Sequence, residues 1–216
     1  MRLRNVSYAK DKIKANQAYI KSIDYDETFD VAALFKYPKQ PLHLEIGCGK
    51  GQFIHTLASR YPNINFLAVE QYDSVIVRAL EKVIDDPKDN LYLLRIDARH
   101  VAKSLPEDSL EKIYLNFSDP WPKVRHEKRR LTHHHFLKLY QTMLKPKGSI
   151  ELKTDNKDLF SYSLMSMNTF GMHFDYITLD LHAEDTNDNI ETEFEEKFKN
   201  QGPIYKLIAT FKEDKS

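Results

Sequence analysis

Residues 42–52 read LHLEIGCGKGQ, a short apolar run followed by three glycines at alternate positions. The run is typical of a buried strand, and the residues after the glycines have the spacing of an amphipathic helix over 52–59. Gly47, Gly49 and Gly51 therefore occupy the turn, where glycine permits a sharp bend and a close approach of backbone to a ligand. The same triplet also occurs in ordinary tight turns, so the flanking sequence must distinguish a ligand-binding turn from an ordinary one.

Outward from this turn, short apolar runs alternate with amphipathic segments, a rhythm that predicts βαβ units. The runs are apolar and β-rich enough to be strands buried on both faces. We predict an α/β fold, a mostly parallel, doubly wound, seven-stranded sheet with helices on both faces and an acidic helical insert between the last two strands. The predicted strands are 42–46, 66–69, 91–96, 113–117, 149–153, 173–179 and 204–211, and the predicted helices are 52–59, 73–84, 132–144 and 159–169.

The length and composition fit one domain. The chain has 216 residues, 41% of them hydrophobic, which suffices for one substantial core. Residues 1–40 lack the strand and helix rhythm and read as a basic N-terminal extension, so the folded domain is expected over 41–216. No apolar run is long enough to span a membrane, no secretion signal is recognisable, and Cys48 has no partner for an intrachain disulfide. These features predict a cytoplasmic protein.

The charges balance in number but not in position. Lys plus Arg and Asp plus Glu both number 32, so the net charge excludes no class of partner. Basic residues gather in 1–21 and 121–130, whereas 180–196 holds eight acids and neither Lys nor Arg. Any one of these runs alone is equally compatible with a solvated surface.

An acid at the end of the second predicted strand indicates a nucleoside ligand. Glu70 follows Gly51 by nineteen positions, where nucleotide-binding folds keep a carboxylate that accepts hydrogen bonds from ribose hydroxyls. The loop runs E-x-G-x-G-x-G and lacks the G-x-G-x-x-G pattern that seats a pyrophosphate. Glu45 beside the glycines would repel a pyrophosphate but tolerate a cofactor that carries an ammonium and a sulfonium.

This loop resembles motif I of the class I S-adenosylmethionine methyltransferases, which have a Rossmann-like fold. The resemblance implies that Glu45 lies near the methionine end of the cofactor, together with the three glycines, and that Glu70 binds the ribose. It also implies that Asp97 and Ala98, at the end of the third strand, contact the adenine. Capping of the next turn is the alternative for Asp97.

The loop after the fourth predicted strand carries the strongest candidate for a catalytic residue. Residues 118–123 read SDPWPK, and two prolines make the loop rigid, which suits a site that must align a nucleophile with a methyl group. A turn with a buried aromatic is the alternative for Trp121. Asp119 is the predicted catalytic residue and is also expected to line the cofactor side.

A basic run follows directly and indicates a polynucleotide partner. The five cations would neutralise phosphates and hold a nucleic-acid strand beside the reaction centre. An enzyme that acts on a small molecule would gain little from five cations at this place. They are Lys123, Arg125, Lys128, Arg129 and Arg130. His133, His134 and His135 would fan out by about 100° each on a helix, so we expect no metal site there.

Five motifs in order resemble the bacterial tRNA guanine-N7 methyltransferase family: LEIGCGKG, VE, NFSDPWPKxRHxKRRL, KTDN and TEFExKF, the last followed by GPIY at 202–205. They span about residues 42–205. The resemblance implies methyl transfer from S-adenosylmethionine to N7 of the guanine at position 46, in the variable loop of tRNA. A ring nitrogen with a free lone pair needs no prior proton removal, so Asp119 is expected to orient the base and favour a cationic transition state.

Two further segments are implied in binding the substrate. Asp155, at the end of the fifth strand, is expected to contact the substrate, with a helix cap as the alternative. Thr192, Glu193, Phe194 and Glu195 are expected on the guanine side, and Thr-x-x-Glu is also a capping box for the helix that follows.

Other functions are compatible with parts of this pattern. Methylation of an exocyclic amine on another nucleic acid would use the same cofactor loop, and a non-catalytic RNA-binding protein would use the basic run alone. A dehydrogenase would need the missing pyrophosphate motif. The predicted partner is tRNA, with no membrane and no metal, and the sequence leaves open whether the protein is a monomer or a homodimer.

Overall fold

The computed structural model describes residues 6–23, 29–184 and 189–212. It consists of two compact units, Met1–Pro106 and Glu107–Ser216, here called unit 1 and unit 2. Each unit has its own strands and its own apolar core.

Unit 1 contains four parallel strands in the order β1-β4-β3-β2. Their side chains are buried along most of their length, as in Leu44, Phe66 and Leu93, each of which has no exposed surface. This burial explains why the strands read as apolar runs and not as alternating patterns. The strands are β1 (Ile20–Ser22), β2 (Leu42–Ile46), β3 (Asn65–Glu70) and β4 (Leu91–Arg95).

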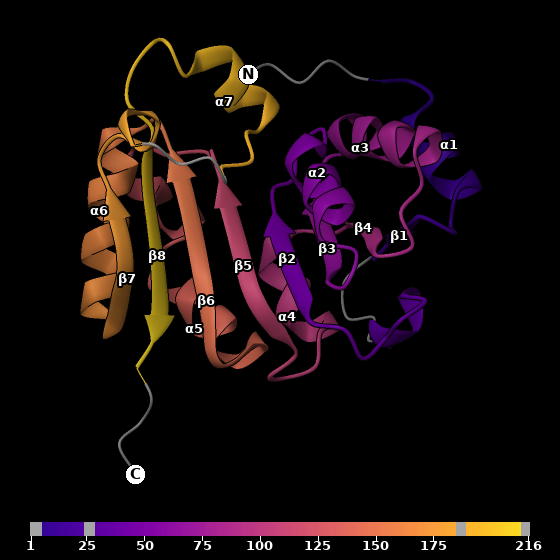
Figure 1. Cartoon of the computed structure of the whole chain (residues 1–216), viewed down its shortest axis with the longest axis horizontal. Helices are drawn as coiled ribbons and strands as arrows, with labels where there is room; N and C mark the ends of the chain where they lie inside the picture. Colours follow the sequence, from indigo (N-terminus) through magenta and orange to yellow (C-terminus); the bar gives the residue numbers. More distant parts are fainter. Residues whose placement is uncertain (1–5, 24–28, 185–188, 213–216) are drawn as a thin grey trace. The chain divides into compact units, whose positions relative to one another are not determined.

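The helices of unit 1 follow their strands closely along the chain. In α3, Ile76, Leu80 and Val83 recur at helical spacing and are buried, which fixes the face that packs on the core. Helix α1 lies alongside α3 (Figure 1), where the Tyr8 hydroxyl donates a hydrogen bond to Glu81 over 2.9 Å. The helices are α1 (Ala9–Ala15), α2 (Gln52–Arg60), α3 and α4 (Asp73–Asp85 and Val101–Ser104), with single 3-10 turns at η1 (Ala32–Leu34) and η2 (Ala98–His100).

The N-terminal extension contributes a strand that the sequence analysis missed. Strand β1 pairs in parallel with β4, with Ile20 opposite Leu93, so the described residues hold eight strands and not the predicted seven. The three-residue strand is too short to show a period in the sequence. It forms because a neighbouring strand offers unpaired backbone groups at its edge.

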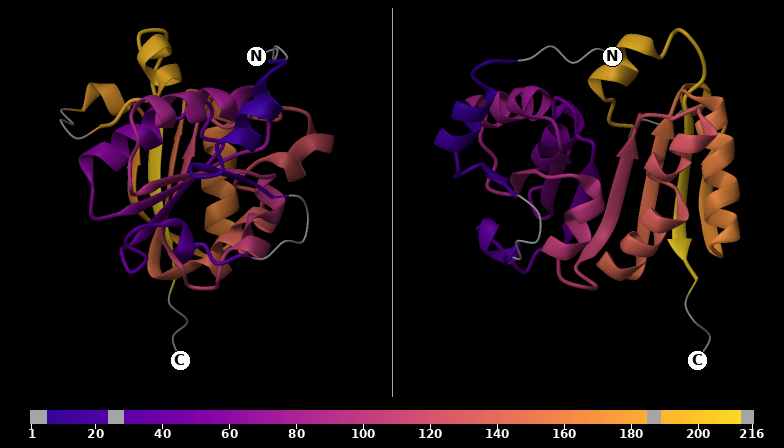
Figure 2. Two further views of the ribbon diagram at one scale, coloured as in Figure 1. Left: turned by 90° about the vertical axis from the view of Figure 1, so that its right-hand side faces the viewer. Right: turned by 180° about the vertical axis from the view of Figure 1, so that it is seen from behind.

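Unit 2 contains four strands in the order β5-β6-β8-β7, of which β5 and β6 are parallel and β8 runs opposite to both of its neighbours. Helices α5 and α6 cover one face of these strands (Figures 1 and 2), and α7 lies beyond the carboxyl ends of β5 and β6 (Figure 1). The elements are β5 (Leu110–Asn116), η3 (Val124–Arg129), α5 (His134–Met143), β6 (Leu144–Thr154), α6 (Lys157–Thr169), β7 (Met172–Thr178), η4 (Leu181–Ala183), α7 (Glu193–Phe198) and β8 (Tyr205–Phe211).

One predicted turn lies inside a strand. Lys145 to Gly148 were expected to separate a helix from a strand, but β6 begins at Leu144 and includes them. The register of β5 against β6 shifts there, and Lys147 has a φ of 67°, so the turn residues form an irregular start to the strand.

The α/β prediction is confirmed, because mostly parallel strands layered with helices belong to the Rossmann-like class. Within the described ranges, no helix combines the length and apolar character needed to cross a bilayer.

Candidate active site

The carboxyl ends of three parallel strands of unit 1 lie side by side. In the sheet register Ile46 is opposite Val69, and Glu70 is opposite Arg95. The glycine turn after β2, Glu70 at the end of β3 and the segment after β4 therefore emerge at one edge. Open α/β sheets bind their ligands at this edge.

The turn after β2 requires glycine at each predicted position. Gly47, Gly49 and Gly51 have φ values of +79°, +59° and +78°, a backbone conformation that side chains rarely adopt. A Cβ on Gly51 would lie 2.8 Å from the Cβ of Ala79 in α3, whereas one on Gly47 or Gly49 would meet no atom within 4 Å. The N–H of Gly47 donates to the carbonyl of Val69 over 2.8 Å, which ties the turn to β3. Open space thus adjoins the backbone at the first two glycines.

Two carboxylates flank this turn in the positions expected of a cofactor site. Glu45 lies in β2 directly before the turn, and only 2% of its surface is exposed. Glu70 is half-buried, and its Oε1 accepts hydrogen bonds from the backbone N–H groups of Gln71 and Tyr72 over 2.8 and 3.1 Å. These bonds hold the Glu70 carboxylate at the end of β3.

Asp97 acts as a helix cap in this structure, which was the alternative considered for it. Its Oδ1 accepts from the N–H of Arg99 over 2.9 Å at the start of η2, in which Ala98 is the first residue. The Arg99 guanidinium also pairs with the carboxylate, at 2.6 Å from Nη2 to Oδ2. The hydrogen bonds from Arg99 hold the pKa of Asp97 below its ordinary value. The Arg99 side chain that pairs with Asp97 is itself exposed to solvent.

The residues of unit 1 fit an adenosine cofactor that carries positive charge. Backbone with positive φ beside open space provides room for a ligand at Gly47 and Gly49. Carboxylates at the ends of β2 and β3 match ribose hydroxyls and an ammonium or sulfonium, and they disfavour a pyrophosphate. The carboxylates and the glycine turn of unit 1 therefore fit S-adenosylmethionine.

In unit 2, the loop after β5 holds Asp119 between two strained residues. Phe117 and Trp121 have φ values of 48° and 42°, which are unusual for bulky side chains and are typical of functional sites. The N–H of Phe117 donates to the carbonyl of Lys153 over 2.8 Å, which ties the start of the loop to β6. Asp119 is exposed, and no described residue of unit 2 forms a hydrogen bond or ion pair with its carboxylate.

Two arginines of the basic run contact this loop. The Arg130 guanidinium donates to the carbonyl of Pro120 over 3.2 Å and to that of Trp121 over 3.1 Å. It also lies 4.2 Å from the centroid of the Tyr162 ring in α6, and the Arg129 guanidinium lies 4.7 Å from the centroid of Trp121. From the sequence, both arginines are expected to bind phosphates only. The geometry gives Arg130 a second role, because its contacts fix the shape of the loop.

The other basic residues of the run are exposed to solvent. Lys123, Arg125 and Lys128 form no ion pair with an acid in the part of the chain that the structure describes. Long cationic side chains without an acidic partner are suited to bind phosphates.

Helix α7 is joined to the end of β6 by a buried ion pair. The Lys153 ammonium donates to Oε2 of Glu195 over 2.6 Å and to the carbonyl of Ile190 over 2.8 Å. The other oxygen of Glu195 accepts from Asn189 over 2.7 Å and lies 3.1 Å from Nε2 of His182. Neither side chain of the pair is exposed at all, and burial lowers the pKa of Lys153.

This burial revises the role expected for Glu195. A carboxylate without exposed surface and with four donors around it does not face a substrate in this conformation. The predicted capping box is confirmed, since Thr192 accepts from the N–H of Glu195 over 3.0 Å and the Glu195 side chain accepts from the N–H of Thr192 over 3.4 Å. Glu195 therefore positions α7, and Thr192 begins it. Lys153 belongs to the KTDN motif, but nothing in the sequence pattern predicts a functional role for it.

Aromatic side chains connect α7 to the Asp119 loop. Phe194 is 39% exposed, and its ring centroid lies 4.9 Å from that of Phe117 and 4.5 Å from that of Phe198. Glu193 precedes it and is half-buried. Asp155 is exposed, and the cap of α6 is its neighbour Asn156, whose side chain accepts from the N–H of Leu159 over 2.8 Å. The capping alternative for Asp155 is therefore wrong.

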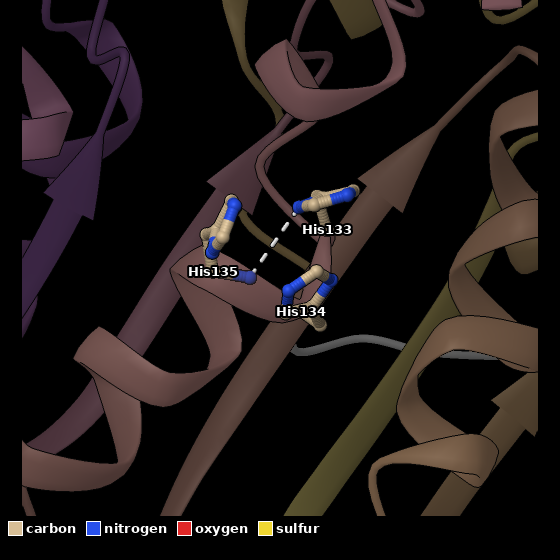
Figure 3. Close-up of side chains that lie close together, drawn as sticks. All are labelled: His133, His134 and His135. Atoms are coloured by element: carbon tan, nitrogen blue, oxygen red, sulfur yellow. Dashed lines mark hydrogen bonds between the residues drawn. The ribbon is translucent and has the colours of Figure 1, made fainter.

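The three consecutive histidines lie together, contrary to the expected fanning. Ring centroids are 4.3 Å apart for His133 and His134, 4.2 Å for His134 and His135, and 4.9 Å for the outer pair (Figure 3). His133 is the N-cap of α5 and has extended backbone with a ψ of 148°, so the helical spacing of 100° does not apply to it. Burial and the two neighbouring imidazoles lower the pKa of His133.

Each unit, taken by itself, brings together some of the predicted site residues. In unit 1 the glycine turn, Glu70 and Asp97 lie at one strand edge. In unit 2 the Asp119 loop meets β6 and α7 through Phe117. The residues that the sequence analysis missed, Phe117 and Lys153, are defined by backbone strain and by burial, neither of which has a sequence signature.

The chain is similar to known methyltransferases. Residues 39–207 match the model of a family described as putative methyltransferase. A tRNA (guanine-N(7)-)-methyltransferase of Lactiplantibacillus plantarum is 49% identical over 98% of this chain and 99% of its own length. A protein of the same name from Staphylococcus carnosus is 44% identical over 98% of this chain and 100% of its own length.

A solved structure gives the same fold at low identity. The 16S rRNA (adenine(1408)-N(1))-methyltransferase of Catenulisporales acidiphilia matches with a TM-score of 0.61 and 12% identity, over 100% of this chain and 96% of that one. At this identity the match supports the fold alone. On the strength of the family model and the full-length relatives, the chain belongs to the bacterial tRNA (guanine-N(7)-)-methyltransferase family of S-adenosylmethionine-dependent enzymes.

Proposed function

We propose that the chain transfers a methyl group from S-adenosylmethionine to N7 of the guanine at position 46, in the variable loop of tRNA. The observation that carries this proposal is the loop after β5. The Asp119 carboxylate is exposed, has no hydrogen-bond or ion-pair partner among the described residues of unit 2, and stands between two strained residues. Lys123, Arg125 and Lys128 follow it and have no acidic partner within the described ranges. This arrangement suits a reaction on a base within a polyanion.

Unit 1 would hold the cofactor. Glu70 would accept hydrogen bonds from the ribose hydroxyls, Asp97 and Ala98 would contact the adenine, and Glu45 would favour the positively charged methionine end. Gly47, Gly49 and Gly51 would let the backbone approach it closely. The bound cofactor would supply an electrophilic methyl group on a sulfonium.

Asp119 would orient the guanine and stabilise charge. The N7 lone pair would form the new bond to the methyl carbon while the bond from that carbon to the sulfonium sulfur breaks and its electron pair stays on sulfur. No proton would have to leave N7 first. As the bond forms, positive charge develops on the guanine ring, and a carboxylate nearby favours that change. The rigid, strained loop keeps Asp119 oriented before the reaction, so no reorganisation is needed at the moment of transfer.

Lys123, Arg125 and Lys128 would bind RNA phosphates, because they are exposed and lack acidic partners among the described residues. Arg129 and Arg130 would have a mixed role. Their charge would attract the RNA, while their contacts with Pro120 and Trp121 keep Asp119 in place. Arg130 is thus proposed as a positioning residue of the Asp119 loop.

The guanine would be recognised by residues at the ends of β6 and α7. Asp155 and Glu193 carry carboxylates able to accept from the N–H groups on the Watson–Crick edge of guanine. Phe194, partly exposed and packed on Phe117, offers a ring face against which a base can stack. Thr192 and Glu195 would act indirectly, by beginning and anchoring α7.

The remaining assignments are also proposals. Residues 41–216 would form the catalytic domain, with 1–40 as a basic extension that adds to RNA binding. The enzyme would act in the cytoplasm, where its tRNA substrate occurs.

Incubation with radiolabelled S-adenosylmethionine and unmodified tRNA tests the function. We expect the label in 7-methylguanosine, mapped to the variable loop by nuclease digestion and mass spectrometry. A tRNA whose variable-loop guanine is replaced by adenine is the matched control and should accept no label. Label in an exocyclic amine, or no transfer by an enzyme that binds both ligands, would overturn the proposal.

A further inference from the structure

His133, His134 and His135, here called the histidine cluster, form a group of potential metal ligands at the start of α5 (Figure 3). Their rings come from consecutive residues, yet the ring nitrogens that could serve as ligands all lie within 4.8 Å of one another. His133 is buried, with 6% of its surface exposed, whereas His134 and His135 are exposed. The cluster therefore has one fixed member and two that can adjust.

The backbone of His133 explains this convergence. As the N-cap of α5 it has a φ of −65° and a ψ of 148°, which directs its ring back toward the first helical turn. The N–H of His133 donates to the carbonyl of Arg130 over 2.9 Å, and its own carbonyl accepts from Phe136 over 2.8 Å. These bonds fix the backbone at this point before any ligand binds.

The ligand atoms of the three histidines lie within 4.8 Å of one another, somewhat farther apart than the ligand atoms of a bound metal ion. Zinc binds imidazole nitrogen at about 2.0–2.1 Å in a tetrahedral arrangement, so ligand nitrogens lie roughly 3.3 Å apart. His134 and His135 are exposed, and binding an ion would require their side chains to rotate so that these separations shorten. The Nδ1 of His133 accepts from the N–H of His135 over 3.4 Å, a long hydrogen bond whose loss is a small obstacle.

The nature of the ligands selects the ion. Neutral imidazole suits divalent zinc, copper and nickel, whereas magnesium and calcium require oxygen ligands. Three protein nitrogens leave one position of a tetrahedral ion open to water. The N-terminus of α5 and the nearby Lys128 disfavour a cation, while Glu127 favours it, so the binding should be weaker than at a closed four-ligand site.

We propose that the histidine cluster binds one divalent transition-metal ion of the zinc type. The ion would join the last residue before α5 to its first turn. Because the N–H of His133 is bonded to the carbonyl of Arg130, an occupied cluster would also restrain the residue that contacts the Asp119 loop. The proposal does not depend on the methyl transfer reaction.

Calorimetric titration of the tag-free, full-length protein with zinc chloride tests the site. We expect saturation at one ion per chain in the wild type and at least a tenfold weaker affinity in His134→Ala/His135→Ala. His133 is left intact in this variant because it caps α5. His173→Ala is the matched control, since His173 is an exposed histidine of unit 2 outside the cluster, and it should bind zinc as the wild type does.

Thermal unfolding gives a second readout. Zinc should raise the unfolding midpoint of the wild type and of His173→Ala but not that of the double variant, while magnesium should raise none of them. Circular dichroism without metal shows whether the variants fold normally. Absence of saturable one-to-one binding in the wild type would overturn the site, as would wild-type affinity in a folded double variant.

Discussion

Lys153 at the end of β6 and Glu195 in α7 form an ion pair of 2.6 Å between Nζ and Oε2, and neither side chain exposes any surface. The pair joins a strand and a helix that lie 42 residues apart in the chain. The backbone carbonyl of Lys153 also accepts a hydrogen bond from the N–H of Phe117. Lys153 therefore contacts both α7 and the Asp119 loop.

Removal of one partner should therefore destabilise the fold strongly. We expect Lys153→Met to lower the free energy of unfolding by about 3–5 kcal/mol, because Glu195 would remain as a buried charge without its ammonium partner. Urea denaturation followed by circular dichroism measures this change. Lys199→Met is the control, since Lys199 pairs with Glu191 at the surface and should contribute at most about 1 kcal/mol.

The double variant Lys153→Met/Glu195→Gln separates the charge from the packing. Gln keeps an oxygen for the capping box and removes the buried charge. Its stability should exceed that of Lys153→Met alone, and a double variant that is no more stable would show that the charge is not the cause.

Arg130 should affect turnover more than RNA binding. We expect Arg130→Lys to reduce single-turnover methyl transfer by roughly tenfold to a hundredfold, because lysine keeps the charge but loses the two-carbonyl contact that orients the loop. Arg125→Gln should instead weaken tRNA binding and reduce the log-log salt slope by about 0.7–0.9. If both variants changed only the salt slope, Arg130 would have no positioning role.

Glu70 should contribute to cofactor affinity. We expect Glu70→Ala to weaken binding of S-adenosylmethionine by roughly 1.5–3 kcal/mol, the scale for losing a charge-assisted hydrogen bond. Glu70→Gln keeps an acceptor for the N–H groups of Gln71 and Tyr72 and tests the charge alone. Calorimetry measures both, with the exposed Asp85→Ala as control. Unchanged affinity in Glu70→Ala would remove Glu70 from the site.

Asp119→Asn should reduce turnover by about a hundredfold or more while leaving the fold and most of the tRNA affinity intact. The change keeps the shape of the side chain and removes the charge that favours the cationic transition state. Single-turnover rates across pH distinguish this role from that of a general base, which predicts a rate that rises with ionisation in the wild type and not in the variant. Near-normal turnover of Asp119→Asn would contradict both roles.

Stability at low pH should depend on Glu151, which lies in β6 between Lys112 and Lys206 at 2.6 and 2.8 Å. Burial raises the pKa of Glu151, but the two lysines outweigh it, and the folded-state pKa is lower than its ordinary value. The stabilisation is therefore fully present above the unfolded-state pKa of about 4.3 and is lost as pH falls through the folded-state pKa.

Acid unfolding followed by fluorescence tests this dependence. Glu151→Gln should be less stable than the wild type at pH 7, and the difference should shrink as the pH falls below about 4. A difference that stays constant with pH would exclude Glu151 as the titrating group.

Local chemistry explains which features were predictable. The glycine turn was predictable because positive φ selects glycine, and the φ values of Gly47, Gly49 and Gly51 are all positive. Amphipathic helices give apolar residues a recurring spacing that can be read from the sequence. The helix predicted over 73–84 is therefore found, as α3 over Asp73–Asp85. The capping box at Thr192 and Glu195 is likewise a local pattern.

The sequence by itself determined the α/β class, the glycine turn and the family, because each depends on residue types at fixed short spacings. Only the tertiary structure decided that Glu195 is buried against Lys153, that Arg130 contacts the Asp119 loop, that β1 extends the strands of unit 1 and that three histidines converge. These features depend on contacts between distant segments or on a single backbone angle. Charge alone does not distinguish a buried, paired side chain from an exposed one, since burial is a property of the packed chain.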